Sequence, residues 1–418
     1  MRLNRELSKI EKKKAEVSGA VVRAVAEILA EVRVKGDAAV RDYAERFDGF
    51  CGDELFVAQE EITAAVKNSG DDFMRILNRA ADQIKEFHTN QKEKSWSIFK
   101  DNGIIMGQII RPLDRVALYV PGGTAPYPST VLMCAIPAML AGVSEIMIFT
   151  PVKTDGKVPD AILAAAACCG IDKICKIGGA HGIAAAAYGT ESIPKADKIV
   201  GPGNIYVATA KRLVYGEVDI DMIAGPSDIL IIADDSANPK YIAADLMSQA
   251  EHDELSSAIL VTTSERIIRE TEAEISQQIA GLSRRDIIQK SLENYGAAIL
   301  ASSLNEAFEI SNSLAPEHLE ILTENPMEKL PLVKNAGSIF LGEYTPEPLG
   351  DYMSGTNHVL PTEGTARFYS PLGVYDFVKW SSFSYYPKAE FDALKDDVIK
   401  FAEMEGLTAH ANSVRVRG

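Results

Sequence analysis

Residues 115–123 read Arg-Val-Ala-Leu-Tyr-Val-Pro-Gly-Gly, a short apolar run that ends in a glycine-rich turn. Such a run, bounded by turn residues, is typical of a strand buried in a parallel sheet. Similar runs follow at residues 146–149, 174–177 and 198–200, with helical patterns between them. This alternation predicts βαβ units and a mostly parallel sheet with helices on both faces.

A second series of the same kind follows the turn Gly225-Pro226-Ser227. Its predicted strands are residues 229–233, 259–262, 298–300, 319–322 and 338–341. Helices are expected to begin near Pro239, Ser264, Asn305 and Asn325, where residues typical of a helix N-cap or first turn stand. The predicted fold class is therefore α/β, with two Rossmann-like parallel-sheet units, an N-terminal helical segment and a C-terminal helical tail.

The same patterns predict a division of the chain. Residues 1–114 form a helical segment that we expect to pack on the second α/β unit. Residues 115–227 form the first α/β unit and residues 228–342 the second. Residues 343–372, rich in Gly, Pro, Thr and Tyr, are predicted to be an active-site loop. Residues 373–418 form a tail, with a charged amphipathic helix over residues 388–405.

Composition excludes several classes of protein. The net charge of −16 argues against nucleic-acid binding, which needs clustered Lys and Arg. The five cysteines form no Cys-x-x-Cys pair and their number is odd, so free thiols are expected. The N-terminus leads into no signal-peptide core. The longest apolar run, residues 131–143, is broken by Pro137 and is too short to span a bilayer. We therefore expect a cytoplasmic protein without membrane or nucleic-acid partners.

Four of the six histidines lie in the C-terminal half, each inside a polar motif. Imidazole binds metals and transfers protons near neutral pH, so a zinc-bearing acid/base site is the first hypothesis. Gln249 and His252 are three residues apart in a helical pattern, which places both on one face. The alternative is a histidine favoured by the dipole at a helix C-terminus, and glutamine is an unusual zinc ligand. The zinc interpretation gains weight if Asp351 and His410 complete a set of four ligands.

The pair Glu317-His318 follows Pro316 and precedes a predicted strand. Proline biases the preceding Ala315 towards an extended backbone, so the pair lies at the boundary between two elements. An imidazole there could take a proton from an alcohol, and the neighbouring carboxylate could activate water. The alternative is an exposed glutamate beside a half-buried histidine.

Three glycine-rich turns follow strands in the first α/β unit. They are Pro121-Gly122-Gly123-Thr124, Gly178-Gly179-Ala180 and Gly201-Pro202-Gly203-Asn204. None matches the full dinucleotide fingerprint, and each could be only a tight strand-to-helix connection. Three in one unit favour a cofactor site.

With these motifs the chain resembles the histidinol dehydrogenase family, from about residue 24 to the C-terminus. The motifs that carry the resemblance are residues 118–123, 201–204, 224–227, 248–252, 315–318, 357–361, 365–368 and 405–413. The resemblance implies a homodimer with shared active sites that oxidises L-histidinol through L-histidinaldehyde to L-histidine with two NAD.

The resemblance also assigns the site residues. Zinc would be held by Gln249, His252, Asp351 and His410, the last from the partner subunit. The substrate pocket would comprise Ser227, Gln249, His252, His318, Asp351, His358, Glu405 and His410. NAD would contact Tyr119, His181 and Asn204.

Catalysis would fall to His318 as the proton acceptor and Glu317 as the residue that activates water. His181 departs from the family pattern, in which Gln is usual at that position, and this puts cofactor placement in question. Two other functions stay open: a zinc- and NAD-dependent dehydrogenase of another small alcohol, and, more distantly, a zinc hydrolase. The chain lacks the His-Glu-x-x-His motif of many zinc hydrolases, and a catalytically silent binding protein would not need the intact Glu317-His318 pair.

Overall fold

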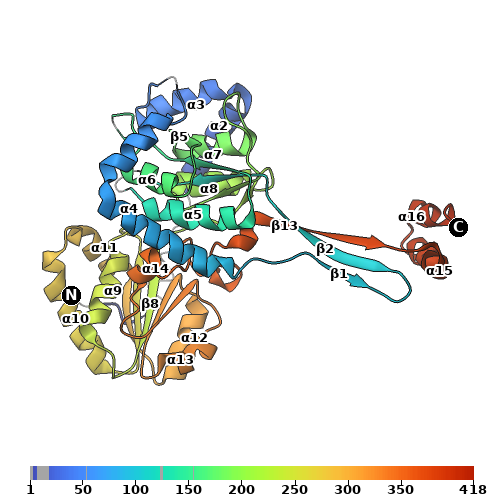
Figure 1. The fold of residues 1–418 in the computed structure, drawn as a ribbon. Helices are drawn as coiled ribbons and strands as arrows, with labels where there is room; N and C mark the ends of the chain where they lie inside the picture. Colours follow the sequence, from blue (N-terminus) through green and yellow to red (C-terminus); the bar gives the residue numbers. More distant parts are fainter. Residues whose placement is uncertain (1–2, 7–17, 53, 123–125, 154) are drawn as a thin grey trace. The chain divides into compact units, whose positions relative to one another are not determined.

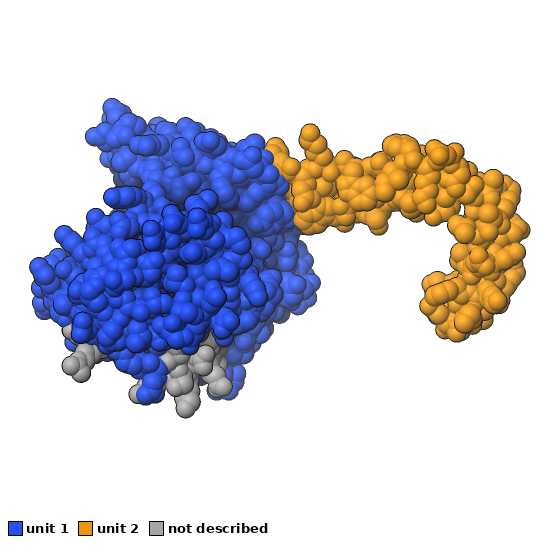
Figure 2. All heavy atoms as spheres, turned by 90° about the horizontal axis from the view of Figure 1, so that it is seen from below, with its two compact units in different colours: residues 1–91, 113–377 blue, residues 92–112, 378–418 orange. Residues whose placement is uncertain are grey.

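The computed structural model describes residues 3–6, 18–52, 54–122, 126–153 and 155–418. They belong to two compact units (Figure 2). One comprises Met1–Gln91 with Leu113–Phe377, and the other Lys92–Pro112 with Val378–Gly418.

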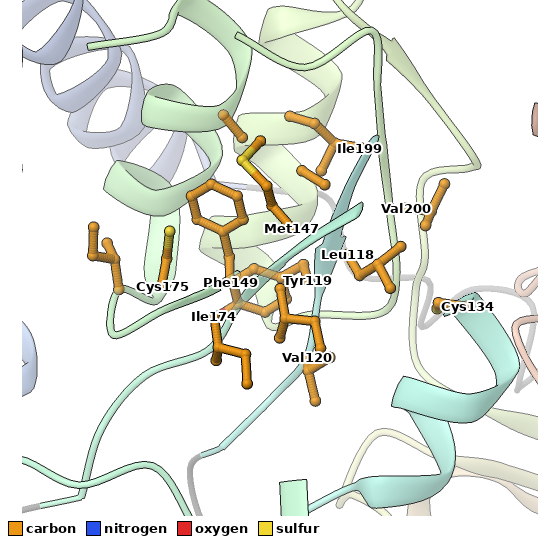
Figure 3. Close-up of a cluster of buried hydrophobic side chains, with 14 of the residues drawn as sticks. Leu118, Tyr119, Val120, Cys134, Met147, Phe149, Ile174, Cys175, Ile199 and Val200 are labelled. Carbon is orange, nitrogen blue, oxygen red and sulfur yellow. The ribbon is translucent and has the colours of Figure 1, made fainter. Parts of the chain in front are cut away.

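The first α/β unit is built on a five-stranded sheet in the order β5-β4-β3-β6-β7, and all neighbouring strands are parallel. Its strands are β3 (Arg115–Tyr119), β4 (Glu145–Phe149), β5 (Ile174–Cys175), β6 (Lys198–Val200) and β7 (Asp219–Ile220). Its helices are α5 (Pro128–Ala141), α6 (Asp160–Cys168), α7 (Gly179–Tyr188) and α8 (Ile205–Val214). Figure 3 shows the buried side chains that the strands contribute, among them Leu118, Phe149 and Ile174. Their burial on both faces explains why these strands read as continuous apolar runs.

The second α/β unit repeats this strand order as β10-β9-β8-β11-β12, again all parallel. Its strands are β8 (Asp228–Ala233), β9 (Ser257–Thr262), β10 (Gly296–Leu300), β11 (His318–Leu322) and β12 (Ser338–Leu341). Its helices are α9 (Pro239–Ala250), α10 (Glu265–Gln278), α11 (Arg285–Tyr295), α12 (Leu304–Leu314) and α13 (Pro326–Lys329), with 3-10 turns η2 (Ile279–Gly281) and η3 (Leu330–Leu332). Along β8, Ile229 and Ile231 join one core cluster while Leu230 and Ile232 join another, as strand periodicity requires. All nine predicted strands are confirmed, and only β7 was missed in these two sheets.

The N-terminal helices do not pack where the sequence analysis placed them. They are α2 (Gly19–Lys35), α3 (Asp37–Tyr43), the π-helix η1 (Ala44–Asp48) and α4 (Gln59–Thr89). In Figure 1 they lie with α5 to α8, and α2 contacts α7 and α8 while α4 contacts α5 and α6. The prediction that they cover the second α/β unit is wrong. The reason is that α6 and α7 are apolar and alanine-rich on every side, so their outer faces need a further layer of helices. Near the start of the chain, Asn4 bridges to Ala297 of the second α/β unit.

The second compact unit contains strands that the sequence analysis missed. β1 (Trp96–Phe99), β2 (Ile105–Pro112) and β13 (Val378–Tyr385) form an antiparallel sheet in the order β1-β2-β13. The helices α15 (Lys388–Met404) and α16 (Thr408–Arg415) follow and pack on each other. The predicted amphipathic helix is confirmed, whereas residues 96–112 are not helical. The strands β1 and β13 were missed because most of their side chains are exposed, so no buried apolar run marks them.

The segment predicted as an active-site loop contains regular structure. It includes α14 (Glu347–Tyr352) and the 3-10 turn η4 (Thr365–Arg367), and η5 (Val374–Phe377) follows it. The buried Asn357 donates from Nδ2 to the Met133 carbonyl oxygen at 2.8 Å, which anchors the segment on α5. None of the helices in the described part of the chain is long and apolar enough to cross a membrane.

Candidate active site

The predicted catalytic pair lies at the amino edge of the second sheet. His318 begins β11 and is paired in register with Ile229 of β8 and Ser338 of β12. In open parallel sheets ligands usually bind at the carboxyl ends of the strands, so this site lies at the opposite edge. The chain enters β11 through Ala315, which ends α12 in the left-handed conformation with φ 52°. The extended backbone that Pro316 predicts at Ala315 is therefore wrong, because that residue serves as the helix C-cap.

Glu317 is locked in place by Asp228, the first residue of β8. The backbone N–H of Asp228 donates to Glu317 Oε2 at 2.9 Å, and the backbone N–H of Glu317 donates to Asp228 Oδ1 at 2.8 Å. Glu317 is buried, not exposed as the alternative interpretation required. Burial raises the pKa of Glu317 well above its usual range, and the negative charge of Asp228 adds to the shift. A carboxyl group with a raised pKa is better suited to proton transfer near neutral pH.

The orientation of the His318 ring follows from its contacts. Its Nδ1 lies 3.1 Å from the Asp228 carbonyl oxygen, which can only accept, so Nδ1 carries the proton. Nε2 is therefore the basic nitrogen, and it lies 3.6 Å from Glu347 Oε1. Burial lowers the pKa of His318 to about 4. The ring is consequently neutral at pH 7, with a free electron pair on Nε2.

Helix α14 brings two carboxyl groups and a second histidine to the same place. Asp351 and Glu347 are one turn apart on this helix, and the Asp351 carboxyl helps to raise the pKa of Glu347. His358 lies close by, with Nδ1 3.1 Å from the Asp351 carbonyl oxygen and 3.6 Å from Asp351 Oδ1. Its other nitrogen is 3.5 Å from the Thr130 hydroxyl of α5.

Gln249 and His252 come from the end of α9. Gln249 is fully buried, and neither its amide nitrogen nor its amide oxygen has a hydrogen-bond partner. Buried polar groups are normally hydrogen-bonded, so a buried amide without partners indicates a place where an ion or ligand binds. The helix ends at Ala250, so His252 lies in the following turn and not on the helix face that its spacing predicted. His252 nevertheless lies near the catalytic pair. Together with Asp351 and His358, it is one of the groups that influence the pKa of His318.

The charge balance of this region fits a divalent cation. One ligand atom each from His318, Glu347 and Asp351 lie within 4.8 Å of one another, close enough to hold a metal ion. Among the ion pairs of the described residues, no lysine or arginine pairs with Glu317, Glu347 or Asp351. Burial, and next the charge of Asp351, raises the pKa of Glu347 to about 9. A bound cation would compensate these carboxyl groups, and the imidazole, carboxylate and amide donors present are compatible with zinc.

The remaining predicted substrate residues fall in two places. Ser227 directly precedes β8 and is half-buried, and its carbonyl oxygen accepts from the Ser257 N–H at 3.0 Å. Glu405 and His410 belong to the second compact unit, where Glu405 caps α15 and His410 lies on α16. Both are exposed. Their participation in the site stays a prediction.

Two of the predicted cofactor residues frame the glycine turns of the first unit. Tyr119 ends β3, and its hydroxyl oxygen accepts from the Gly179 N–H at 3.1 Å. Asn204 caps α8, accepting at Oδ1 from the N–H groups of Tyr206 and Val207. A Cβ added to Gly201 would lie 2.2 Å from the Tyr119 carbonyl oxygen, so only glycine allows this close approach of the two segments. The carboxyl ends of β3 and β6 thus meet at one place, the position where dinucleotides bind in such sheets.

A buried ion pair holds the turn between β6 and α8. Lys211 Nζ donates to the Gly201 carbonyl oxygen at 2.9 Å, and the Gly201 N–H donates to Asp221 Oδ2 at 2.7 Å. Lys211 and Asp221 also form a short ion pair, and their side chains are 2% and 1% exposed. Both backbone groups of Gly201 are therefore anchored.

His181 is placed differently from Tyr119 and Asn204. Its side chain is 1% exposed, with Nε2 3.4 Å from Asp48 Oδ2. The rings of Tyr43 and Phe47 cover it, each with a centroid distance of 6.1 Å. In this arrangement the imidazole faces the N-terminal helices, and the carboxylate of Asp48 is the more exposed member of the pair.

Sequence reasoning missed several residues of the site. Asp228 was missed although it follows the turn Gly225-Pro226-Ser227 directly. Glu347 stands four residues before Asp351, a spacing that places both on one helical face. Glu320 is an acid inside the otherwise apolar run of β11, which is a recognisable signal of a buried polar network. Asp48 left no sequence signal.

Known proteins similar to this chain belong to one family. The family model described as histidinol dehydrogenase matches residues 11–418. The chain belongs to the histidinol dehydrogenase family. A histidinol dehydrogenase from Lactococcus lactis is 61% identical over 98% of this chain and 95% of its own length. One from Clostridium acetobutylicum is 55% identical, with coverage of 98% and 95%.

A solved structure is also similar. The crystal structure of histidinol dehydrogenase from Elizabethkingia anophelis has a TM-score of 0.93 at 39% identity, covering 99% of this chain and 96% of that one. The match to the family model spans both α/β units.

Proposed function

We propose that this chain oxidises L-histidinol through L-histidinaldehyde to L-histidine, the last step of histidine biosynthesis, with zinc and two NAD. The observation that carries the proposal is the His318 ring, whose Nδ1 is committed to the Asp228 carbonyl oxygen while Nε2 is left basic beside Glu347 and Asp351. A neutral imidazole in this position suits removal of a proton from an alcohol.

Two residues would share the proton chemistry. His318 Nε2 accepts the proton of the substrate hydroxyl in the first oxidation. Glu317, whose pKa is raised by burial, takes a proton from the water that adds to the aldehyde. As the water adds, His318 returns its first proton to the aldehyde oxygen, which gives the hydrated aldehyde and restores the neutral ring. In the second oxidation His318 accepts the hydroxyl proton of that hydrated aldehyde. The buried site keeps the reactive aldehyde from bulk water between the two steps.

Zinc would be held by Gln249, His252 and Asp351 together with His410 of the partner subunit. When bound, zinc would anchor the imidazole and amine of the substrate, and two NAD molecules would accept the two hydrides. The unpaired amide of Gln249 and the carboxyl groups without a lysine or arginine support a cation at this place. Ser227, His358 and Glu405 would complete the substrate pocket.

NAD would bind at the turns next to Tyr119 and Asn204. The anchored Gly201 turn and the hydrogen bond of Tyr119 to Gly179 support a preformed site there. His181 would influence NAD binding through its contact with Asp48, because its own ring is buried.

A homodimer with shared active sites follows from the proposal that His410 completes the zinc site of the partner. The second compact unit supports this by its exposed apolar side chains, which include Phe401 at 67% and Met404 at 80% exposure on α15. Such side chains are typical of a surface that is covered in an assembly. A cytoplasmic location agrees with the five free cysteines.

Substrate choice separates histidinol oxidation from the other functions. The zinc-loaded protein is incubated with NAD and either L-histidinol or a primary amino alcohol without an imidazole, and NADH absorbance is followed. NADH formation with histidinol alone supports the proposal. Equal turnover of both would assign the protein to another small alcohol, and cleavage of an ester without NADH formation would make it a hydrolase.

A further inference from the structure

We propose that the buried carboxyl groups of Asp245 and Glu320 form a positioning pair that holds α9, β11 and α14 in the arrangement that the zinc site needs. The proposal rests on the zinc site of the function proposed above and adds two residues outside its ligand set. Neither residue is expected to touch the metal or the substrate.

Glu320 links the catalytic strand to the helix that carries Asp351. It lies two residues after His318 on β11, so both side chains point to the same face of the sheet. Glu320 is fully buried, and its Oε1 accepts from the backbone N–H of Glu347 at 2.8 Å. Glu347 is the first residue of α14, and an N–H in the first turn of a helix has no partner within the helix. The Glu320 carboxyl thus acts as the N-terminal anchor of α14.

Asp245 links the same carboxyl group to α9. It lies one turn before Gln249, on the same side of the helix, and is hydrogen-bonded to Glu320. Both carboxyl groups are buried, and no N–H or O–H group of the described side chains reaches Glu320 Oε2.

A second contact runs in parallel between α9 and α14. Ser248 Oγ donates to the Asp245 carbonyl oxygen at 2.8 Å and lies 3.4 Å from Glu347 Oε2. Asp245 and Glu320 therefore lie where α9, β11 and α14 meet. These three elements carry Gln249, His318 and Asp351. Displacing any of them by a few tenths of an ångström would alter the spacing between metal donors, which zinc tolerates poorly.

The test uses matched substitutions in the full-length, zinc-reconstituted protein. Glu320→Gln preserves both contacts, because the amide oxygen can accept from the Glu347 N–H and the amide nitrogen can donate to Asp245. Glu320→Leu has a similar size but leaves the Glu347 N–H and the Asp245 carboxyl buried without a partner. Asp245→Asn and Asp245→Leu make the same comparison from α9 if Glu320→Leu does not fold. Ile268→Ala, on α10 in the core of the same α/β unit, is the control for general destabilisation.

Zinc affinity is measured by competition with a chelator, and hydrogen exchange is followed in residues 347–352. We expect Glu320→Leu to weaken zinc binding by about tenfold or more and to accelerate exchange in that segment. Glu320→Gln should stay within about threefold of the wild type, in the range of a preserved contact. Ile268→Ala should lower the melting temperature without weakening zinc binding.

Two results would overturn the positioning role: wild-type zinc affinity in both leucine variants, or equal losses in Glu320→Gln and Glu320→Leu. A wild-type protein that binds no zinc would instead overturn the metal part of the proposed function.

Discussion

The Nδ1 atom of His318 lies 3.1 Å from the backbone carbonyl oxygen of Asp228. This contact joins the first residues of two neighbouring parallel strands and commits one ring nitrogen to donation. The other nitrogen faces the carboxyl groups of α14. The tautomer of the proposed base is thus set by the backbone of the sheet.

Replacement of His318 by glutamine should remove the base and leave the zinc ligands in place. We expect kcat for histidinol oxidation to fall by about 10²- to 10⁴-fold, the usual contribution of a general base. Zinc content, measured by atomic absorption, should stay at the wild-type level. Retention of full kcat in His318→Gln would remove this residue from the mechanism.

The low pKa of His318 predicts a pH dependence of stability. Because burial holds the folded-state value at about 4, below the ordinary 6.5, the unfolded chain binds more protons between these pH values. The free energy of unfolding should therefore fall as the pH is lowered, by about 2 kcal/mol from this group between pH 7 and pH 5. Urea unfolding of the zinc-free protein measures the change, and His318→Gln should show a smaller one. Identical pH dependence in both proteins would contradict the assignment.

The strands and helices could be predicted because their local patterns agree with their final environment. The run from Val116 to Val120 is buried on both faces of its sheet, so it reads as a strand without knowledge of its neighbours. The position of the N-terminal helices could not be predicted, since the apolar stripe of α2 would fit either α/β unit. What decides between them is the bare outer face of α7, a property of the assembled unit.

The site was predicted from motifs rather than from geometry. Glu317 and His318 are adjacent in the chain and could be found together, whereas Asp228 is 89 residues away from Glu317 and pairs with it only through the sheet register. For His252, the local pattern itself was misleading. Its spacing from Gln249 predicted a position on α9, but the helix ends two residues earlier.

Removal of the Lys211 charge should weaken NAD binding and leave the zinc site unchanged. Lys211→Met leaves Asp221 buried without a counter-ion, which should cost about 3–5 kcal/mol of unfolding free energy. It also frees the Gly201 turn, so the affinity for NAD, measured by calorimetry, should fall while zinc content does not. Lys195→Met serves as the control, since it removes an exposed ion pair with Glu217 and should change the unfolding free energy little. Equal effects of the two substitutions would contradict a special role of the buried pair.

Shared active sites predict complementation between two inactive variants. A mixed dimer of His252→Ala and His410→Ala subunits has one site with both histidines and one site with neither. Random mixing should therefore restore about a quarter of the wild-type activity, because half of the dimers are mixed and each has one intact site. If His410 served its own subunit, mixing would restore nothing.

The most direct test of the proposed function is the number of NADH molecules formed for each L-histidinol consumed, with zinc-free and zinc-restored protein compared side by side. The structure and the family assignment predict two NADH per histidinol, lost on removal of zinc and regained on its return. One NADH per histidinol with release of the aldehyde, or undiminished turnover in the zinc-free protein, would contradict it.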